Sequence, residues 1–266
     1  MYTLPCPSFP FSQFPSEKIA NLRTFQCYMK ARLIEHPDQE IIDKWTLWSQ
    51  TVPTAHFFQG PVYARLVNES RIYRHGLVIV EHDDHSWAGL ISFILLHEYR
   101  YIFPVLTTRA VVYGGPVLDE CLSEPEKLKC VSLALACLTE VLKNRCLYIQ
   151  FRNFTDTTAY SGVFSQHGYR FSDRLNLLKP IAIVEDARME MSATRRRQLR
   201  LSTENGLTIK QAETPEEIDR LYFLLKRLYR EKVRKPLPAK NFFHHFFTIA
   251  KAENCGKVLL AEYRGE

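Results

Sequence analysis

The chain has 266 residues, of which 46% are hydrophobic and 24% charged, and it carries a net charge of +6. These values are those of a globular protein and exclude a wholly disordered chain, and the length allows two domains or one large one. No apolar run approaches the ~18 residues that a membrane span needs, so we expect no transmembrane segment.

Residues 1–28 are rich in proline and phenylalanine and lack periodicity, so we expect an irregular N-terminal leader. They have no basic start followed by an apolar stretch, which argues against a secretory signal. Either these residues form a loosely docked arm, or Met29 is the true start of the protein. The seven cysteines are odd in number and contain no C-x-x-C pair, which predicts reduced thiols and a cytoplasmic location.

Residues 29–186 alternate between strand and helix patterns. The best-marked helix begins at Ser123, where Ser123 and Glu126 form a capping box and Pro125 lies in the first turn. Alternation of this kind, with some strand pairs adjacent in sequence, predicts a mixed α/β sheet. The expected strands are 29–36, a pair joined by a polar turn within 76–96, 109–118, 145–151 and a strand through residue 180; the other expected helices are 38–50, one from residue 61 and a short one ending at Gly168.

A second unit is expected after a basic helix at 187–206. It begins with a strand at 207–213 and a helix capped by Thr214 and Glu217, followed by a helix at 241–254 and a strand from residue 257. The apolar stripe of the capped helix is Ile218, Leu221, Tyr222, Leu225, Leu228 and Tyr229. A single terminal strand cannot satisfy its own backbone groups. It therefore pairs with the first unit or belongs to a longer protein, and we favour the longer protein.

Several stretches, in order along the chain, resemble the FemABX peptidoglycan-bridge aminoacyltransferases and the related BioF2-like acyltransferases. The stretches are "HFFQGPVYARL", with Phe58, Gln59 and Tyr63 in matching positions; "TTRAVVYGGPVL"; "YIQFRNF", with the pair Arg152 and Asn153; "SATRRRQLRLSTENGLTI"; and "LYREKVRKPLPAKNFF" with "GKVLLAEYRGE".

The resemblance implies an α/β fold with tandem GNAT-like (acyl-CoA N-acyltransferase) domains and mixed sheets. Residues 29–186 would form the first domain, 187–206 the linking helix, and 207–266 the start of a second, incomplete domain. The implied activity is transfer of an acyl or aminoacyl group to an amine, most concretely on a cytoplasmic cell-wall (muropeptide) precursor. The alternatives are acyl-CoA transfer to a polysaccharide or small amine, and a non-catalytic binding module. The donor would be aminoacyl-tRNA or acyl-CoA, with no bound cofactor.

The strongest ligand candidate is the basic helix, which carries Arg195, Arg196, Arg197 and Arg200. Between residues 186 and 240 there are fourteen Lys or Arg and eight Asp or Glu, so the positive charge is localised. Guanidinium groups at this helical spacing can bind phosphate or carboxylate, which indicates an anionic small molecule, a lipid-linked precursor at a membrane surface, or aminoacyl-tRNA. The alternative is a solvated helix with acidic neighbours. Duplex DNA is not expected, because no recognised binding module surrounds the run.

Other candidates for substrate binding are Lys232 and Lys235, at a helix end before a proline-fixed turn, which can alternatively serve the helix dipole. Gln59, Tyr63, Arg109 and Tyr113 are candidates for the lining of a cleft in the first unit, the alternative being that Tyr113 packs and Arg109 caps a strand. We assign no catalytic residue and no metal site, since the residues of "EHDDH" (81–85) are better explained as a polar turn.

The first unit is expected to be unfit for the pyrophosphate of CoA. In GNAT folds that group binds backbone N–H groups at a helix start. Here Pro116 removes one N–H, and the helix start is crowded by carboxylates that would repel it: Asp119, Glu120, Glu124 and Glu126.

Overall fold

The computed structural model describes residues 2–5, 28–71, 73–97, 104–173, 184–234 and 237–263. The chain divides into two compact units, Met1–Asp173 and Arg174–Glu266, and each is described by itself.

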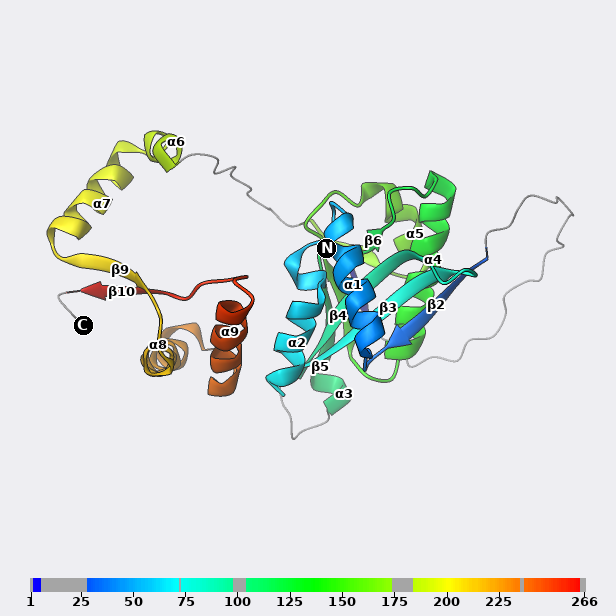
Figure 1. The fold of residues 1–266 in the computed structure, drawn as a ribbon, viewed down its shortest axis with the longest axis horizontal. Helices are drawn as coiled ribbons and strands as arrows, with labels where there is room; N and C mark the ends of the chain where they lie inside the picture. Colours follow the sequence, from blue (N-terminus) through cyan, green and yellow to red (C-terminus); the bar gives the residue numbers. More distant parts are fainter. Residues whose placement is uncertain are drawn as a thin grey trace, which may run out of the picture. The chain divides into compact units, whose positions relative to one another are not determined.

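Unit 1 is built on one mixed sheet with the strand order β2-β3-β4-β5-β7-β1-β8, and β6 pairs with β4 (Figure 1). Among the described strands, β5 and β7 form the one parallel pair. The strands are β1 (Tyr2–Pro5), β2 (Met29–Ile34), β3 (Arg74–His82), β4 (Trp87–His97), β5 (Thr108–Tyr113), β6 (Val117–Leu118), β7 (Tyr148–Arg152) and β8 (Arg170–Phe171).

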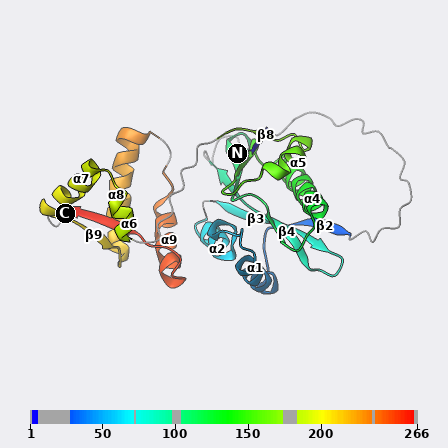
Figure 2. The ribbon, with the colours of Figure 1, turned by 90° about the horizontal axis from the view of Figure 1, so that it is seen from above.

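Helices cover both faces of this sheet: α1 and α2 lie on one side, and α4 and α5 lie on the other (Figure 2). Alternate residues of β3 therefore enter different cores, with Val78 packing in the core of α4 and Ile79 in the core of Trp45 from α1. The helices of unit 1 are α1 (Gln39–Thr51), η1 (Phe57–Gln59), α2 (Pro61–Glu69), α3 (Pro104–Thr107), α4 (Glu124–Leu142), η2 (Thr158–Tyr160) and α5 (Ser161–Gln166).

The helix start expected at Ser123 is confirmed, since the side chains of Ser123 and Glu126 form the capping box of α4. At the start of α1, Asp38 accepts a hydrogen bond from the Ile41 N–H at 2.9 Å, a cap that the sequence analysis did not assign. The hairpin expected within residues 76–96 is present as β3 and β4. The strand expected through residue 180 lies outside the described residues.

The first residues of the expected leader are not irregular, since Tyr2–Pro5 form β1 between β7 and β8. A leader does not have to be unstructured when the sheet offers it backbone partners on both sides. Residues 6–27 lie outside the described part of the chain.

Unit 2 consists of helices and a two-stranded antiparallel sheet of β9 and β10. Its core joins Ala212, Ile218 and Phe247, with Leu260 of β10 packed against them. The terminal strand thus pairs with β9 in the same unit, a partner that the sequence analysis did not consider. The elements are α6 (Val184–Met189), α7 (Ala193–Glu204), β9 (Leu207–Gln211), α8 (Pro215–Leu228), η3 (Tyr229–Val233), α9 (Lys240–Ala252) and β10 (Leu259–Tyr263).

Candidate functional site

The topology of unit 1 points to the carboxyl ends of β5 and β7. In α/β sheets, ligands bind beyond the carboxyl ends of parallel strands, at the point where the direction of the connections changes. Tyr113 ends β5 and faces its register partner Arg152, which ends β7. The strands stay joined one residue further, where the Gly114 N–H donates to the Arg152 carbonyl at 2.9 Å.

A Gly-Gly turn follows β5 and can be made only by glycine. Gly114 has φ +91° and Gly115 has φ +82°, a region that side chains with a Cβ disfavour. There is also no room for a Cβ, which would lie 2.7 Å from Gln59 Nε2 at Gly114 and 2.9 Å from Asn153 Oδ1 at Gly115. The turn therefore brings backbone close to side chains from η1 and from the end of β7.

Gln59 locks η1 onto this turn. Its buried amide donates from Nε2 to the Gly115 carbonyl at 2.9 Å, and its Oε1 accepts from the His56 N–H at 2.9 Å. The Gln59 carbonyl accepts from Trp45 Nε1 at 2.9 Å. One residue of η1 is thus bonded to the Gly-Gly turn, to the start of its own loop and to α1.

Aromatic rings gather where η1, α2 and the two strand ends meet. The ring of Phe58 lies 5.2 Å from Tyr63, 5.6 Å from Tyr113 and 5.8 Å from Phe154, measured between centroids. Phe57 joins the group at 5.6 Å from Phe58. Phe57 and Phe58 remain 37% and 40% exposed, so the cluster presents apolar surface to solvent.

Arg152 adds a positive charge to this aromatic surface. Its guanidinium lies 5.4 Å from the centre of the Tyr113 ring, and its Nε donates to Gln150 Oε1 at 3.1 Å. Within the described part of the chain, no carboxylate pairs with Arg152. Its remaining N–H groups can therefore bind an anionic group of a ligand. We call Phe57, Phe58, Tyr63, Tyr113, Arg152 and Phe154 the aromatic–arginine site.

Two titratable groups near the site are uncharged at neutral pH. Burial, with smaller contributions from Tyr113 and Tyr73, raises the pKa of Tyr63, so its phenol keeps its proton and can donate a hydrogen bond. Burial lowers the pKa of His75 to about 3. The neutral His75 ring shares a 2.8 Å hydrogen bond with Ser92 Oγ. Ser92 Oγ also donates to the Phe58 carbonyl of η1 at 3.4 Å.

The structure brings together three of the four residues expected in the first unit. Tyr63 and Tyr113 are part of the aromatic–arginine site, and Gln59 bonds the adjoining turn. Arg109 lies at the other end of β5, four residues or about 13 Å from Tyr113 along the strand. There its Nη1 donates to the Tyr148 hydroxyl at 3.3 Å.

The sequence analysis did not assign Arg152, Asn153 and Phe154 to the site, although Arg152 ends β7 and the other two residues follow it directly. The signal available in the sequence was their position at the end of the strand expected at residues 145–151. Asn153 donates from Nδ2 to Thr157 Oγ1 at 2.6 Å, while its Oδ1 is buried without a hydrogen-bond partner among the described residues. His56 Nε2, beside Phe154, is in the same state.

The helix start that a CoA pyrophosphate would need in unit 1 is occupied by the protein itself. Glu126 accepts from the Ser123 N–H at 2.9 Å and from Ser123 Oγ at 2.6 Å, and these bonds lower the pKa of Glu126. The chain before α4 is tied down as β6, which pairs with β4, and Asp119 accepts from the Cys121 N–H. An ionised carboxylate thus stands at the N-terminus of α4.

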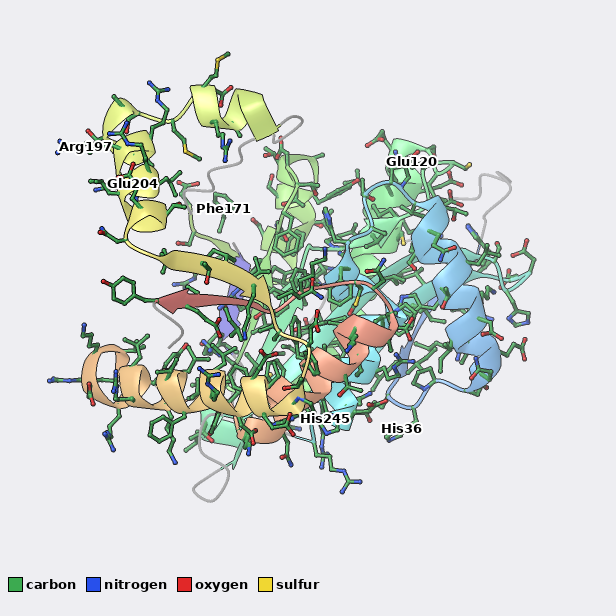
Figure 3. The ribbon with its side chains drawn as sticks, turned by 60° about the vertical axis from the view of Figure 1, so that its left-hand side comes forward. His36, Glu120, Phe171, Arg197, Glu204 and His245 are labelled. Carbon is green, nitrogen blue, oxygen red and sulfur yellow. The ribbon has the colours of Figure 1, made fainter. Side chains whose placement is uncertain are left out.

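Unit 2 carries the positive charge of the protein, with 19 Lys and Arg against 12 Asp and Glu, while unit 1 has 16 against 17. All four arginines of α7 are exposed. Arg196 donates to the Met189 carbonyl at the end of α6 at 2.9 Å, and Arg200 lies 3.5 Å from Glu204. Arg195 and Arg197 have no side-chain partner among the described residues, and Arg197 points outward from α7 (Figure 3).

Arg195 and Arg197 are therefore available to an anion, and the role of the α7 arginines stays a prediction. Lys232 is exposed in η3, and Lys235 lies outside the described residues.

Acidic residues of the polar turn at 81–85 form ion pairs with basic side chains of β2. Glu81 pairs with Arg32 at 3.1 Å, and Asp83 lies 3.7 Å from Lys30. Over the described ranges, no group of three or more His, Cys, Asp or Glu side chains is arranged to hold a metal ion. The five described cysteines are free thiols, and no described helix is long and apolar enough to cross a membrane.

Unit 1 is thus an α/β protein with one parallel pair among its described strands, and the aromatic–arginine site lies at the carboxyl end of that pair. No family model and no curated protein sequence matches the chain. Among solved structures, the chain is similar to FemX, with a TM-score of 0.59 and 13% identity over 87% of this chain and 58% of the FemX chain. The expected FemABX/GNAT-like fold is thus confirmed.

Two other structures match less well. One is the aminoglycoside antibiotic 6'-N-acetyltransferase AAC(6')-Ih from Acinetobacter baumannii, with a TM-score of 0.38 and 11% identity over 58% of this chain and 99% of that chain. The other is a GCN5-related glucosamine N-acetyltransferase region of a fungal multi-domain GH3 beta-N-acetylglucosaminidase, with a TM-score of 0.43 and 9% identity over 94% of this chain and 28% of that chain. Both scores are too low to support an argument about fold or function.

Proposed function

We propose that the chain is part of an acyl- or aminoacyltransferase that moves an activated acyl group to an amine, and that unit 1 binds the acceptor. The most concrete acceptor is a cytoplasmic cell-wall precursor, a UDP-linked muropeptide. The observation that carries the proposal is the aromatic–arginine site at the carboxyl ends of β5 and β7, on a fold similar to that of FemX.

The chemistry of the site suits such an acceptor. Exposed ring faces of Phe57 and Phe58 can pack against a sugar or a nucleobase, because both have flat apolar surfaces. Arg152, without a carboxylate partner among the described residues, can bind a phosphate or carboxylate in two-point fashion. The protonated phenol of Tyr63 can donate to a polar group of the same ligand.

The transfer itself needs positioning more than bond-forming side chains. The acceptor nitrogen attacks the carbonyl carbon of the donor ester or thioester, a C–N bond forms, and the C–O or C–S bond to the donor breaks. The proton lost by the amine leaves with the tRNA hydroxyl or the CoA thiol. Holding the amine against the carbonyl supplies much of the rate, and we assign no side chain as acid or base.

The proposed acceptor is tested by isothermal titration calorimetry, in which a UDP-linked muropeptide is titrated into the wild-type chain and into Arg152→Gln. We expect Arg152→Gln to weaken binding at least tenfold, as loss of a charge-assisted hydrogen bond does. Arg32→Gln is the matched control, because Arg32 lies on β2 at the other edge of the sheet and pairs with Glu81. Equal affinity of all three proteins would remove the site from the proposal.

We propose that the α7 arginines contribute to binding a phosphate-bearing substrate, either the precursor or aminoacyl-tRNA. The double variant Arg196→Ala and Arg200→Ala should weaken binding of the precursor or of tRNA and leave thermal stability nearly unchanged, because exposed ion pairs stabilise little. The control is Arg220→Ala with Arg227→Ala on α8, which removes the same charge from exposed positions. Matching losses in both double variants would show a general charge effect and refute a specific role.

The acyl-CoA alternative makes a different prediction. Because Glu126 occupies the start of α4, we expect unit 1 to show no saturable binding of acyl-CoA. Saturable acyl-CoA binding that is lost in Arg152→Gln would favour an acyl-CoA transferase acting on a polysaccharide or small amine.

A further inference from the structure

Strand β1 fills a gap in the sheet of unit 1 between strands from the far end of that unit. Tyr2–Pro5 pair antiparallel with β7 along four residues, from Tyr2 opposite Phe151 to Pro5 opposite Tyr148. On its other side, β1 pairs with β8 through two residues, Tyr2 opposite Phe171 and Thr3 opposite Arg170. The first residues of the chain are thus built into a sheet whose neighbouring strands come from residues 148–171.

Among the described residues, no turn joins β1 to a neighbouring strand. β1 forms no hairpin with β7 or with β8, and the next described residue along the chain is Tyr28, just before β2. In the strand order, β2 is at the opposite end of the path from β8. The backbone ladder itself therefore determines where β1 binds, as it does when a separate peptide adds to a sheet.

The β7 wall of the gap does not depend on β1. β7 is held from its other side by the parallel ladder with β5, which runs from Arg109 opposite Tyr148 to Tyr113 opposite Arg152. β8 follows α5, and Tyr169 immediately before it is buried against Phe151 and Phe164. Without β1, the edge of β7 would expose a row of unpaired backbone groups, which is the surface that an extended peptide recognises.

We propose that the gap between β7 and β8 is a binding slot for an extended peptide strand, and that β1 occupies this slot reversibly. A separate peptide with the sequence of residues 1–5 binds there when β1 is absent. The slot borders the aromatic–arginine site, because the register ends with Tyr2 opposite Phe151, one residue before Arg152. Among the described residues, β8 has only β1 as a ladder partner, so β8 is ordered when the slot is filled and loses its order when the slot is empty. The chain leaves unit 1 two residues after β8, at Asp173.

Hydrogen exchange on the intact chain tests whether β1 opens separately. A strand of four residues opens more easily than the eleven-residue β4 at the centre of the sheet. We expect the amides of residues 2–5 and 170–171 to exchange together, at least 100-fold faster than those of β4. Protection of β1 equal to that of β4 would overturn the proposal, since β1 would then be a fixed part of the core.

Peptide addition tests the slot directly. The chain that starts at Met29 should show a melting temperature that rises and saturates with the peptide Met1–Pro5, because a ligand that binds only the folded state stabilises it. In the intact chain, the connection to the rest of the protein gives β1 an effective concentration on the order of a millimolar. Because β1 fills the slot at that concentration, we expect the free peptide to reach half-saturation in the millimolar range or below. The full chain, whose slot is filled, should respond at least tenfold less at the same peptide concentration.

The control peptide carries Thr3→Pro, which removes a backbone N–H from the middle of the strand and should abolish the effect. If the shortened chain folds only with the wild-type peptide present, the slot is confirmed. A shortened chain that stays unfolded with the peptide, or that responds equally to both peptides, overturns the proposal. These readouts do not involve the muropeptide, so their failure is separate from failure of the proposed function.

Discussion

Replacing Gln59 by leucine should destabilise unit 1 more than any exposed substitution does. The change keeps a side chain of similar size but removes the two hydrogen bonds that the buried amide makes, leaving the Gly115 carbonyl and the His56 N–H without their partners. A buried group left unpaired costs about 1–3 kcal/mol, so the two together give roughly 2–6 kcal/mol. That is a large fraction of the stability of a domain, which is about 5–15 kcal/mol.

The assay is urea unfolding followed by tryptophan fluorescence. All three tryptophans, Trp45, Trp48 and Trp87, belong to unit 1, so the signal reports on that unit. The control is Gln39→Leu, which removes an exposed hydrogen bond to Asp43 at the start of α1. A loss below about 0.5 kcal/mol in Gln59→Leu, as expected for the control, would refute the claim that Gln59 locks η1 onto the Gly-Gly turn.

Three further outcomes follow from the geometry. Gly115→Ala should destabilise unit 1 by about 1–3 kcal/mol in the same assay, since φ is +82° and the added Cβ meets a side chain at 2.9 Å; an unchanged midpoint would contradict this. An alkylating reagent at pH 8 should modify exposed Cys121 long before Cys130, whose pKa burial raises to about 12, and mass spectrometry of early peptides shows which reacts. The hydrogen bonds from Lys210 and from the backbone lower the pKa of Glu217 from 4.5 to about 2. The ionised Glu217 side chain therefore stabilises unit 2 above pH 4.5, and this stabilisation is lost as the pH falls towards 2. In Glu217→Gln, the free energy of unfolding of unit 2, measured by circular dichroism, should fall less steeply between these pH values. An unchanged pH dependence would count against the pairing of Glu217 with Lys210.

The local structure was largely predictable because its signals lie within a few residues. Ser123 with Glu126 and Thr214 with Glu217 mark helix starts by hydrogen bonds that span three residues, and both capping boxes are present. The apolar runs of β3 and β4 predict strands because both faces of the sheet are covered.

Features set by distant contacts were not predictable. The parallel pairing of β5 with β7 joins residues about 40 positions apart, and only that pairing brings Arg152 to Tyr113. The insertion of β1 depends on a gap that no local pattern announces. Arg109 shares β5 with Tyr113 but lies at the opposite end of that strand.

The apolar stripe of α8 shows how periodicity can overstate burial. Ile218 is 1% exposed in the core of unit 2, as expected, whereas Leu228 at the other end of the stripe is 41% exposed. Periodicity shows which face of a helix is apolar, but the neighbouring elements decide how much of that face is covered.

The most direct test of the account is to determine by photocrosslinking which part of unit 1 an acceptor contacts. A photoreactive benzoylphenylalanine at Phe58, which is 40% exposed within the aromatic–arginine site, should form an adduct with a UDP-linked muropeptide that excess unmodified precursor suppresses. The same group at Leu47, 65% exposed on α1, is the control and should give no such adduct. Labelling that is equal at both positions, or that the free precursor does not suppress, would contradict the assignment of the acceptor to this site.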